Sequence, residues 1–280
     1  MKINLNNLLN VVGDVALRRR ARWLISNMNL KKGDIILDVG CGDGFYLYLL
    51  SKIDSTFKLT GVDINVRSLK SAEENLKGKK VNLIQADVLK LPFPNDTFDK
   101  IIASEVLEHV NEDHLALTEI NRVLKKGGIF VLSVPHKNYP FFWDPINWTL
   151  DHLFDVHIKS GFWAGIWNQH LRLYTKDSLQ TLLKKGGFKK VTTAKLTHYC
   201  LPFNHYIINI VAIILASKKM PDIFQKLFSK YEENYQAHLK HSSLQRNKFS
   251  LFTPIFFFDR LNDNWDEKGS AVSLVAVCEK

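Results

Sequence analysis

The stretch that decides the fold is ILDVGCGDGFYLYLL, residues 36–50. An apolar run carries an acid at Asp38, and glycines follow at Gly40, Gly42 and Gly44 before the apolar spacing becomes that of a helix. Glycine lets the backbone approach a ligand closely and adopt turns that other residues disfavour. This order of strand, glycine turn and helix predicts a ligand-binding loop at the end of a strand.

Two phosphate-binding loops are excluded by the residues that follow the glycines. A Walker loop ends in Gly-Lys-Ser/Thr, and the chain reads Gly44-Phe45-Tyr46 there. A dinucleotide fingerprint needs a third glycine at the position of Phe45. The carboxylate of Asp38 repels a pyrophosphate and attracts an ammonium. It can also orient the amides of the loop, and a ligand with a cationic amino-acid end and a nucleoside end would fit this pattern.

Beyond this stretch, short apolar runs alternate with helical patterns. We expect strands over residues 34–39, 57–63, 81–87, 98–106, 129–135, 189–200 and 270–280. We expect helices over residues 44–53, 66–77, 113–126 and 175–188. Gly127–Gly128 should end the third helix, and Thr175 should cap the fourth. Such alternation predicts an α/β fold with a parallel sheet covered by helices on both faces.

These residues, taken in order, resemble the class I S-adenosylmethionine (SAM)-dependent methyltransferases, in their small-molecule, type 11-like form. LDVGCGDG resembles the first motif of that family, Asp63 and Asp87 end its second and third strands, and EVLEHV follows its fourth. The resemblance is close over residues 30–136 and looser over 171–198 and 271–279. It implies one Rossmann-like, doubly wound domain over residues 1–280, with SAM as the cofactor. The implied sheet has seven strands in the order 3-2-1-4-5-7-6, with strand 7 antiparallel.

The resemblance also implies which residues contact the cofactor. Asp63 would bind the ribose, Ile64 would pack on the adenine face, and Asp87 would contact the adenine amino group. The full set of expected contacts is Asp38, Gly40, Cys41, Gly42, Gly44, Asp63, Ile64, Ala86, Asp87, Val88, Ser104, Glu105 and His109.

A metal site has to be considered near the fourth expected strand. Glu105, His109 and Asp113 follow one another four residues apart, so they could share a helical face. The family mostly works without a metal at this place. We therefore expect these side chains to line the methyl donor or to have a structural role, and we expect no metal.

The reaction itself sets modest demands on the protein. Transfer of a methyl group from a sulfonium is an in-line displacement, so positioning and the exclusion of water dominate. A base is needed only where the nucleophile arrives protonated. His136, directly after the fifth expected strand, is the candidate base or acceptor contact. The alternative is a loop histidine bonded to the backbone.

The acceptor is not named by any motif, but some classes are disfavoured. The net charge of +10 suits an anionic partner, and a lysine-rich solvated surface explains it equally. Adenine-N6 methyltransferases of this fold carry a Pro-Pro motif after the fourth strand, where this chain reads ASEVLEHV. Cytosine-C5 methyltransferases use a cysteine that follows a proline, and no cysteine of this chain follows one. A small-molecule, lipid or glycan acceptor is therefore favoured over nucleic acid. An RNA methyltransferase and a SAM-binding protein that does not methylate, such as a regulatory partner or an aminopropyl transferase, stay open as alternatives.

Two insertions interrupt the alternation of strands and helices. Residues 136–174 are aromatic and loop-like, with Pro145 as a breaker, and should form a lid or substrate pocket. Residues 201–269 should form a helical insertion between the last two strands. Within it, the apolar runs 206–216 and 249–258 are too short to span a bilayer. We expect them either to contact a membrane surface beside lysines or to bury each other as a cap on the sheet.

The termini and the cysteines indicate the compartment. Residues 1–23 have no continuous apolar run, so we expect no signal peptide, and Cys41, Cys200 and Cys278 are too far apart for a disulfide framework. We expect a cytoplasmic protein, with peripheral contact to the inner membrane face as an open alternative. The basic cluster Arg18–Arg20 falls in an amphipathic helical pattern, whose outer face it should occupy.

Overall fold

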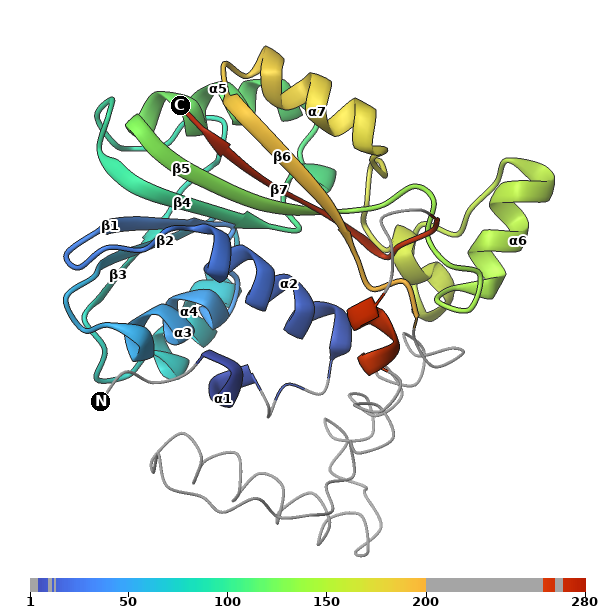
Figure 1. Cartoon of the computed structure of the whole chain (residues 1–280), viewed down its shortest axis with the longest axis horizontal. Helices are drawn as coiled ribbons and strands as arrows, with labels where there is room; N and C mark the ends of the chain where they lie inside the picture. The colour runs from blue at the N-terminus through green and yellow to red at the C-terminus, as the bar shows by residue number, and fades with distance from the viewer. Residues whose placement is uncertain (1–4, 10–11, 13, 200–258, 265–268) are drawn as a thin grey trace, which may run out of the picture.

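A seven-stranded sheet runs through the centre of the computed structural model (Figure 1). Its order is β3-β2-β1-β4-β5-β7-β6, and β7 runs antiparallel to both of its neighbours. The order and the antiparallel seventh strand are those that the family resemblance implies, so the predicted fold is confirmed. The strands are β1 (Ile35–Val39), β2 (Lys58–Asp63), β3 (Val81–Gln85), β4 (Phe98–Ser104), β5 (Leu124–Pro135), β6 (Lys189–Leu196) and β7 (Ser273–Glu279). The structure describes residues 5–9, 12, 14–199, 259–264 and 269–280.

Helices cover both faces of the sheet, with α5 and α7 on one side and α2, α3 and α4 on the other (Figure 1). The α-helices are α1 (Leu5–Leu9), α2 (Val15–Asn27), α3 (Phe45–Ile53), α4 (Val66–Asn75), α5 (Asp113–Val123), α6 (Pro145–Phe154) and α7 (Lys176–Lys185). Short 3₁₀ turns are η1 (Leu107–His109), η2 (Phe162–Trp167) and η3 (Leu261–Asn264). Within the described ranges, none of the helices has the length and apolar character needed to cross a membrane.

The sheet separates two apolar cores, one under each helical layer. Leu117 of α5 and Leu183 of α7 belong to one core, while Leu24 of α2 and Leu47 of α3 belong to the other. Because the central strands are buried on both faces, they read as almost continuous apolar runs in the sequence. A charged residue inside such a strand, as Asp38 is in β1, therefore needs an explanation beyond packing.

The C-terminal strand returns to the same sheet, as expected. β7 lies between β5 and β6, with Phe130 opposite Cys278 and Thr192 opposite Val277. Most of the expected helical insertion, including its apolar runs 206–216 and 249–258, lies outside the described residues.

The expected end of the third helix is wrong. The helix α5 ends at Val123, and Gly127–Gly128 lies inside β5. Tertiary pairing explains the difference, since the Thr97 amide donates to the Val123 carbonyl at 2.8 Å and Leu124 already pairs with β4. A Cβ at Gly128 would lie 2.7 Å from a methyl carbon of Leu124, so a residue without a side chain is needed at this point of β5.

The aromatic segment 136–174 is more ordered than its loop-like composition predicted. Pro145 begins α6 instead of breaking it, because a proline in the first helical turn forfeits no hydrogen bond. The Asp144 side chain caps this helix at the Asn147 amide and also accepts from the Ile166 amide at 3.0 Å. Segment 136–174, called the α6 lobe below, is held to α2 and the start of β7 by a small third core. Its six residues are Ala16, Tyr139, Trp143, Ile166, Trp167 and Val272.

The arginine cluster of α2 is not on a solvated face, contrary to expectation. Arg18 is 5% exposed and pairs with Asp259, as does Arg19, which also reaches Asp263 at 2.7 Å. Arg20 lies 3.5 Å from a carboxylate oxygen of Glu105. Burial lowers the pKa of Arg18 to about 10. The acidic partners of Arg18 and Arg19 come from the other end of the chain, which helical periodicity cannot reveal.

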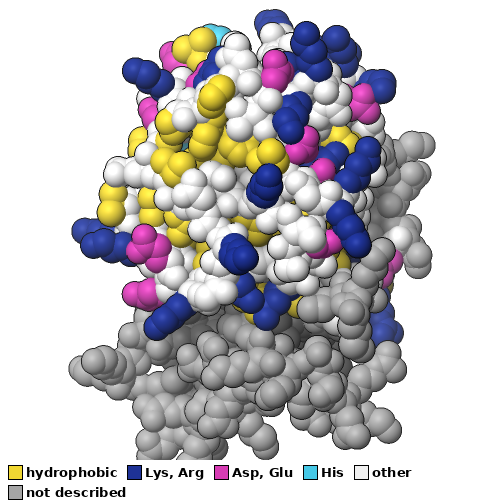
Figure 2. Space-filling view, turned by 90° about the vertical axis from the view of Figure 1, so that its left-hand side faces the viewer, with side chains coloured by type: hydrophobic (Ala, Val, Ile, Leu, Met, Phe, Trp, Pro, Cys, Tyr) yellow, Lys and Arg dark blue, Asp and Glu magenta, His cyan; other side chains and the backbone are white. Residues whose placement is uncertain are grey.

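On the face shown in Figure 2, Lys and Arg side chains are spread out, with Asp and Glu side chains among them. This distribution fits a solvated surface on that face and gives no basic patch there for an extended polyanion.

Candidate active site

The loop after β1 is built from residues with positive φ. Gly40, Gly42 and Gly44 have φ of 67°, 54° and 84°, a region that side chains disfavour. A Cβ at Gly40 would lie 2.6 Å from Val106, so packing alone requires glycine there. At Gly42 no atom lies within 4 Å of the position of a Cβ. Gly40 therefore closes the loop against the segment after β4, and Gly42 leaves open space.

Asp63, the last residue of β2, fastens this loop to the second strand. One carboxylate oxygen accepts from the Gly42 amide at 2.9 Å, and the other accepts from the Asn65 amide at 2.8 Å. The Asn65 side chain in turn caps α4. The next residue, Ile64, is an apolar side chain that is 67% exposed. A carboxylate with lone pairs to spare and an exposed apolar side chain thus lie next to the glycine loop.

Asp38 is the buried acid of the site. It is 1% exposed, and its Oδ2 has no hydrogen-bond donor within the described part of the chain. Burial raises the pKa of Asp38 well above its usual value, and Asp63 and Asp43 raise it further. Cys41 is buried as well, and burial raises the pKa of its thiol, so it is not a thiolate nucleophile.

The end of β3 comes to the same edge of the sheet. The Ala86 amide donates to the Asp63 carbonyl at 3.1 Å, which brings the two strand ends together. Asp87 is exposed and accepts from the Leu89 amide at 2.9 Å, while Ala86 and Val88 are half-buried. The structure thus brings the residues expected around the ribose and adenine to one edge.

A row of hydrogen bonds crosses the ends of α3, β4 and β5. The Tyr46 hydroxyl lies 2.9 Å from Ser104 Oγ, which lies 2.9 Å from Ser133 Oγ, and Ser133 donates to Glu105 at 2.9 Å. Burial raises the pKa of Tyr46 to about 12, so the phenol keeps its proton. Glu105 also faces Arg20, so this row is held at a fixed place beside the loop.

Glu105, His109 and Asp113 do not share a helical face, which their spacing had left possible. Glu105 has φ of 56°, residues Leu107–His109 form a 3₁₀ turn, and α5 begins only at Asp113. Asp113 points to Arg172 at 2.7 Å and to the Tyr174 hydroxyl at 2.9 Å. The four-residue spacing therefore does not bring the three side chains onto one helix, because the left-handed conformation of Glu105 turns the chain away directly after β4.

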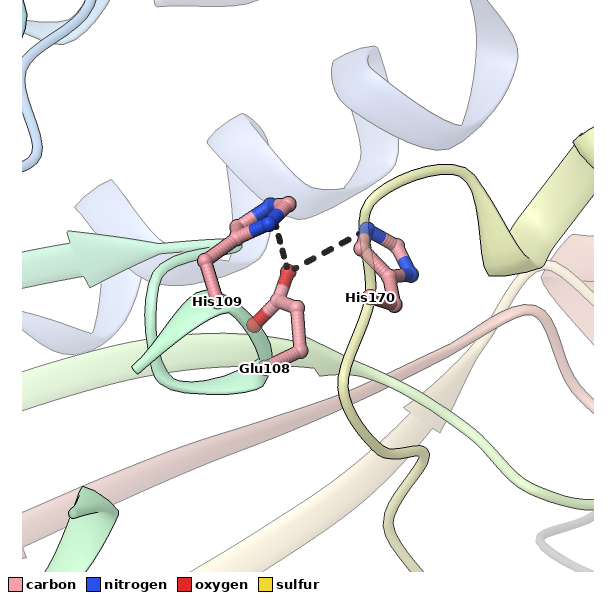
Figure 3. Close-up of side chains that lie close together, drawn as sticks. All are labelled: Glu108, His109 and His170. Carbon is pink, nitrogen blue, oxygen red and sulfur yellow. Dashed lines mark ion pairs between the residues drawn. The ribbon is translucent and has the colours of Figure 1, made fainter. Parts of the chain in front are cut away.

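A different group forms at the same place, and Figure 3 shows it: Glu108, His109 and His170. Glu108 is fully buried, and burial, followed by the charge of Glu105, raises its pKa well above the usual value. Burial, followed by His109, lowers the pKa of His170 to about 4. Sequence reasoning missed Glu108, although Glu108 stands inside the EVLEHV motif, and it assigned His170 only to the aromatic insertion 136–174.

His136 follows β5, as predicted, but it is 3% exposed. Its Nδ1 lies 3.2 Å from the Ala271 carbonyl, and burial together with Lys195 lowers its pKa to about 4. A neutral, backbone-bonded imidazole fits the alternative of a structural loop histidine. Its role in turnover stays a prediction.

Comparisons with known proteins agree with this geometry. A family model described as a methyltransferase domain matches residues 37–132. The demethylmenaquinone methyltransferase of Staphylococcus aureus (strain JH9) is 33% identical over 203 residues, covering 69% of this chain and 82% of that protein.

Two solved structures show the same fold. A SAM-dependent methyltransferase from Archaeoglobus fulgidus superposes with a TM-score of 0.53 at 17% identity, over 93% of this chain and 91% of that one. The Haemonchus contortus phosphoethanolamine N-methyltransferase 2, in complex with SAM, gives 0.55 at 15% identity, over 99% of this chain and 56% of that one. With the glycine loop and the strand-end acids in place, the chain belongs to the class I SAM-dependent methyltransferases and uses SAM as its cofactor.

Proposed function

We propose that the glycine loop, Asp63 and Asp87 bind SAM as the family resemblance implies. The observation that supports this is the contact between Asp63 and the Gly42 amide at 2.9 Å, which fixes the acid beside the open side of the loop. Asp63 would accept hydrogen bonds from the ribose, Ile64 would cover the adenine, and Asp87 would contact the adenine amino group. Buried Asp38 would favour the cationic amino-acid end.

The chemistry needs little beyond this placement. The methyl carbon forms a bond to the acceptor as its bond to sulfur breaks, and the sulfonium becomes the neutral thioether of S-adenosylhomocysteine. Because charge disappears from sulfur in this step, a site that positions both partners and excludes water is sufficient. His136 would act only as a positioning residue or acceptor contact, since a pKa of about 4 makes it a weak base.

The proposed acceptor is a quinone-type lipid in its reduced form. The single observation that carries this is the relative at 33% identity, named as acting on demethylmenaquinone, of which the chain covers 82%. The alignment reaches beyond the family model, which ends at residue 132. Such an acceptor suits an apolar surface, and the lobe that carries α6 exposes Phe142, Leu153, Phe154 and Trp163 at 57%, 68%, 66% and 52%.

The same exposed side chains suit a peripheral contact with a membrane, where a lipid acceptor resides. The runs 206–216 and 249–258, expected to make this contact, lie outside the described residues. Flotation with anionic and neutral liposomes tests both surfaces, using the intact chain, Phe154→Lys for the α6 lobe, and Ile210→Lys and Phe257→Lys for the two runs. A chain that stays with the soluble fraction at low salt contradicts the membrane contact.

The acceptor is tested with the purified full-length chain and SAM carrying a tritiated methyl group. We expect the label to enter a short-chain demethylmenaquinol and to be extracted with the quinone. Glycans, transfer RNA and cell extract serve as competing acceptors in parallel reactions. Label in one of those instead, from a protein that binds SAM normally, would overturn the quinone assignment and leave the methyltransferase assignment intact.

A further inference from the structure

Three side chains from two separate segments converge beside the end of β4. Glu108 and His109 come from η1, and His170 comes from the loop that follows η2 (Figure 3). Glu108 Oε1 lies 3.9 Å from His109 Nε2 and 3.9 Å from His170 Nε2. The three ligand atoms all lie within 4.8 Å of one another. The Leu171 amide, which donates to the Glu108 carbonyl at 2.8 Å, holds the two segments in this arrangement.

The Glu108 carboxyl group is the unusual member of this cluster. Its side chain is 0% exposed, and neither of its oxygens has a hydrogen-bond partner within the described part of the chain. A buried carboxyl group without donors is unfavourable in either protonation state and is rare in native proteins. Figure 3 shows one of its oxygens directed to the space between the two imidazole rings. A positively charged ligand at that point would satisfy it.

His109 is already oriented to be a ligand. Its Nδ1 lies 3.1 Å from the Gln169 carbonyl, which can only accept, so Nδ1 carries the proton. The lone pair is then on Nε2, the nitrogen that faces Glu108. Metal-binding histidines are commonly oriented in this way, by a carbonyl that accepts from the second ring nitrogen. The side chain of His109 is 40% exposed, which gives an ion a path from solvent.

We propose that Glu108, His109 and His170 bind one divalent cation of the zinc class. Two imidazoles and one carboxylate suit Zn²⁺, Fe²⁺ or Co²⁺, and a three-residue set leaves coordination positions open. Ligand atoms about 2.1 Å from a tetrahedral metal lie roughly 3.4 Å apart, so side-chain shifts of up to about 0.7 Å for each histidine complete the site. The nearby arginine, Arg20, lies 3.5 Å from Glu105 and, within the described part of the chain, forms no ion pair with Glu108, although its charge acts on both Glu108 and His170. This proposal departs from the expectation, made from the sequence, that the chain holds no metal.

The position of the cluster indicates what the cation does. Val106, two residues before Glu108, fills the space that a side chain at Gly40 would need, so η1 lies directly against the cofactor loop. A cation here would hold an oxygen of the acceptor and lower the pKa of an acceptor hydroxyl. This role rests on the proposed quinol acceptor, whereas the binding of the cation does not.

Binding is measured on the full-length chain with Co²⁺ as the probe, by its visible absorption bands and by calorimetry. We expect one Co²⁺ per chain, displaced by Zn²⁺. His109→Gln and His170→Gln should each weaken binding at least about tenfold, since losing even an outer partner of a metal ligand has an effect of that size. His114→Gln is the matched control, because His114 is an exposed histidine of the neighbouring helix α5 and lies 3.6 Å from Glu112, outside the proposed cluster.

His109→Gln changes a partly exposed residue, so it keeps the test valid if a variant at buried Glu108 fails to fold. The proposal is overturned if the native chain binds no Co²⁺, or if both glutamine variants bind it as the native chain does. Because the measurement involves no turnover, it separates the metal site from the proposed function. If the native chain binds Co²⁺ but transfers no methyl group to the demethylmenaquinol, the proposed acceptor is wrong and the metal site stands.

Discussion

Replacing Asp63 by alanine tests the cofactor site most directly. Asp63 is the residue through which the second strand, the glycine loop and the proposed ribose contact are joined. Each of its oxygens accepts one backbone amide, from Gly42 at 2.9 Å and from Asn65 at 2.8 Å. A carboxylate oxygen has about two acceptor sites, so one on each oxygen is left for the ribose hydroxyls.

The size of the effect follows from these contacts. A hydrogen bond to a charged group contributes about 1.5–3 kcal/mol. Since about 1.4 kcal/mol corresponds to a factor of ten in affinity, losing one ribose bond should weaken SAM binding about tenfold or more, and losing two about a hundredfold. Asp63→Asn, which retains one accepting oxygen, should fall between Asp63→Ala and the native chain.

Calorimetry with SAM and with S-adenosylhomocysteine measures this loss, and thermal unfolding without ligand checks the fold. Glu73→Ala is the control, because Glu73 is an exposed acid on the nearby helix α4. The control should bind SAM as the native chain does. If Asp63→Ala keeps native SAM affinity within about twofold while the protein is folded, the ribose assignment of this residue is wrong.

Four further predictions concern the loop, His136 and the buried arginines. Gly42 and Gly78 both have positive φ and open space at the Cβ position, so Gly42→Ala and Gly78→Ala should each reduce the free energy of unfolding by about 1 kcal/mol. Only Gly42→Ala should also weaken SAM binding, and equal SAM affinity in the two variants would contradict a close approach of the ligand to this loop. His136→Ala should lower kcat while the SAM dissociation constant stays within about twofold, and full activity on the true acceptor would make His136 a structural residue. The pKa of His136 is lowered to about 4 in the folded chain, whereas an unfolded histidine has a pKa of about 6.5. Below about pH 6.5 the unfolded chain therefore binds one more proton than the folded chain, and stability should fall toward acid pH. His136→Gln should lessen that fall in thermal midpoints measured from about pH 7 to about pH 5. Asp259→Ala removes a carboxylate that is 5% exposed and paired with two arginines, so urea unfolding should show a loss of about 3–5 kcal/mol in the free energy of unfolding. Asp263→Ala, at an exposed partner of Arg19, should lose less than about 1 kcal/mol. Similar losses in the two variants would contradict the buried pair.

The structure places Asp38, the glycine loop, Asp63 and Asp87 at the carboxyl ends of parallel strands, as the sequence predicted, while their contacts with the cofactor stay a proposal. This was foreseeable because the signal is local: a buried strand, then Asp38 and the glycines, then a helix. The same holds for Asp63, which directly ends a strand. Local order of this kind survives in any tertiary arrangement that pairs the strands in parallel, since their carboxyl ends then share one edge.

Where long-range contacts decide, the sequence alone misleads. The spacing of Glu105, His109 and Asp113 suggested a helical face, but a left-handed residue at Glu105 turns the chain away. The helix before β5 was expected to end at a glycine pair, but strand pairing with β4 ends it earlier. In each case a hydrogen-bonded neighbour from elsewhere in the chain overrides the local preference.

By itself, therefore, the sequence determined the class of fold and the strand-end acids that we propose bind the cofactor, and its resemblance to a family implied the order of the strands and the cofactor. Only the tertiary structure decided which charges are buried together. Asp259 meets Arg18, and His170 meets Glu108, across long stretches of chain that carry no periodic signal linking them. The physical reason is that periodicity reports which face of a single element is apolar, whereas the partner of a buried charge depends on how distant elements dock.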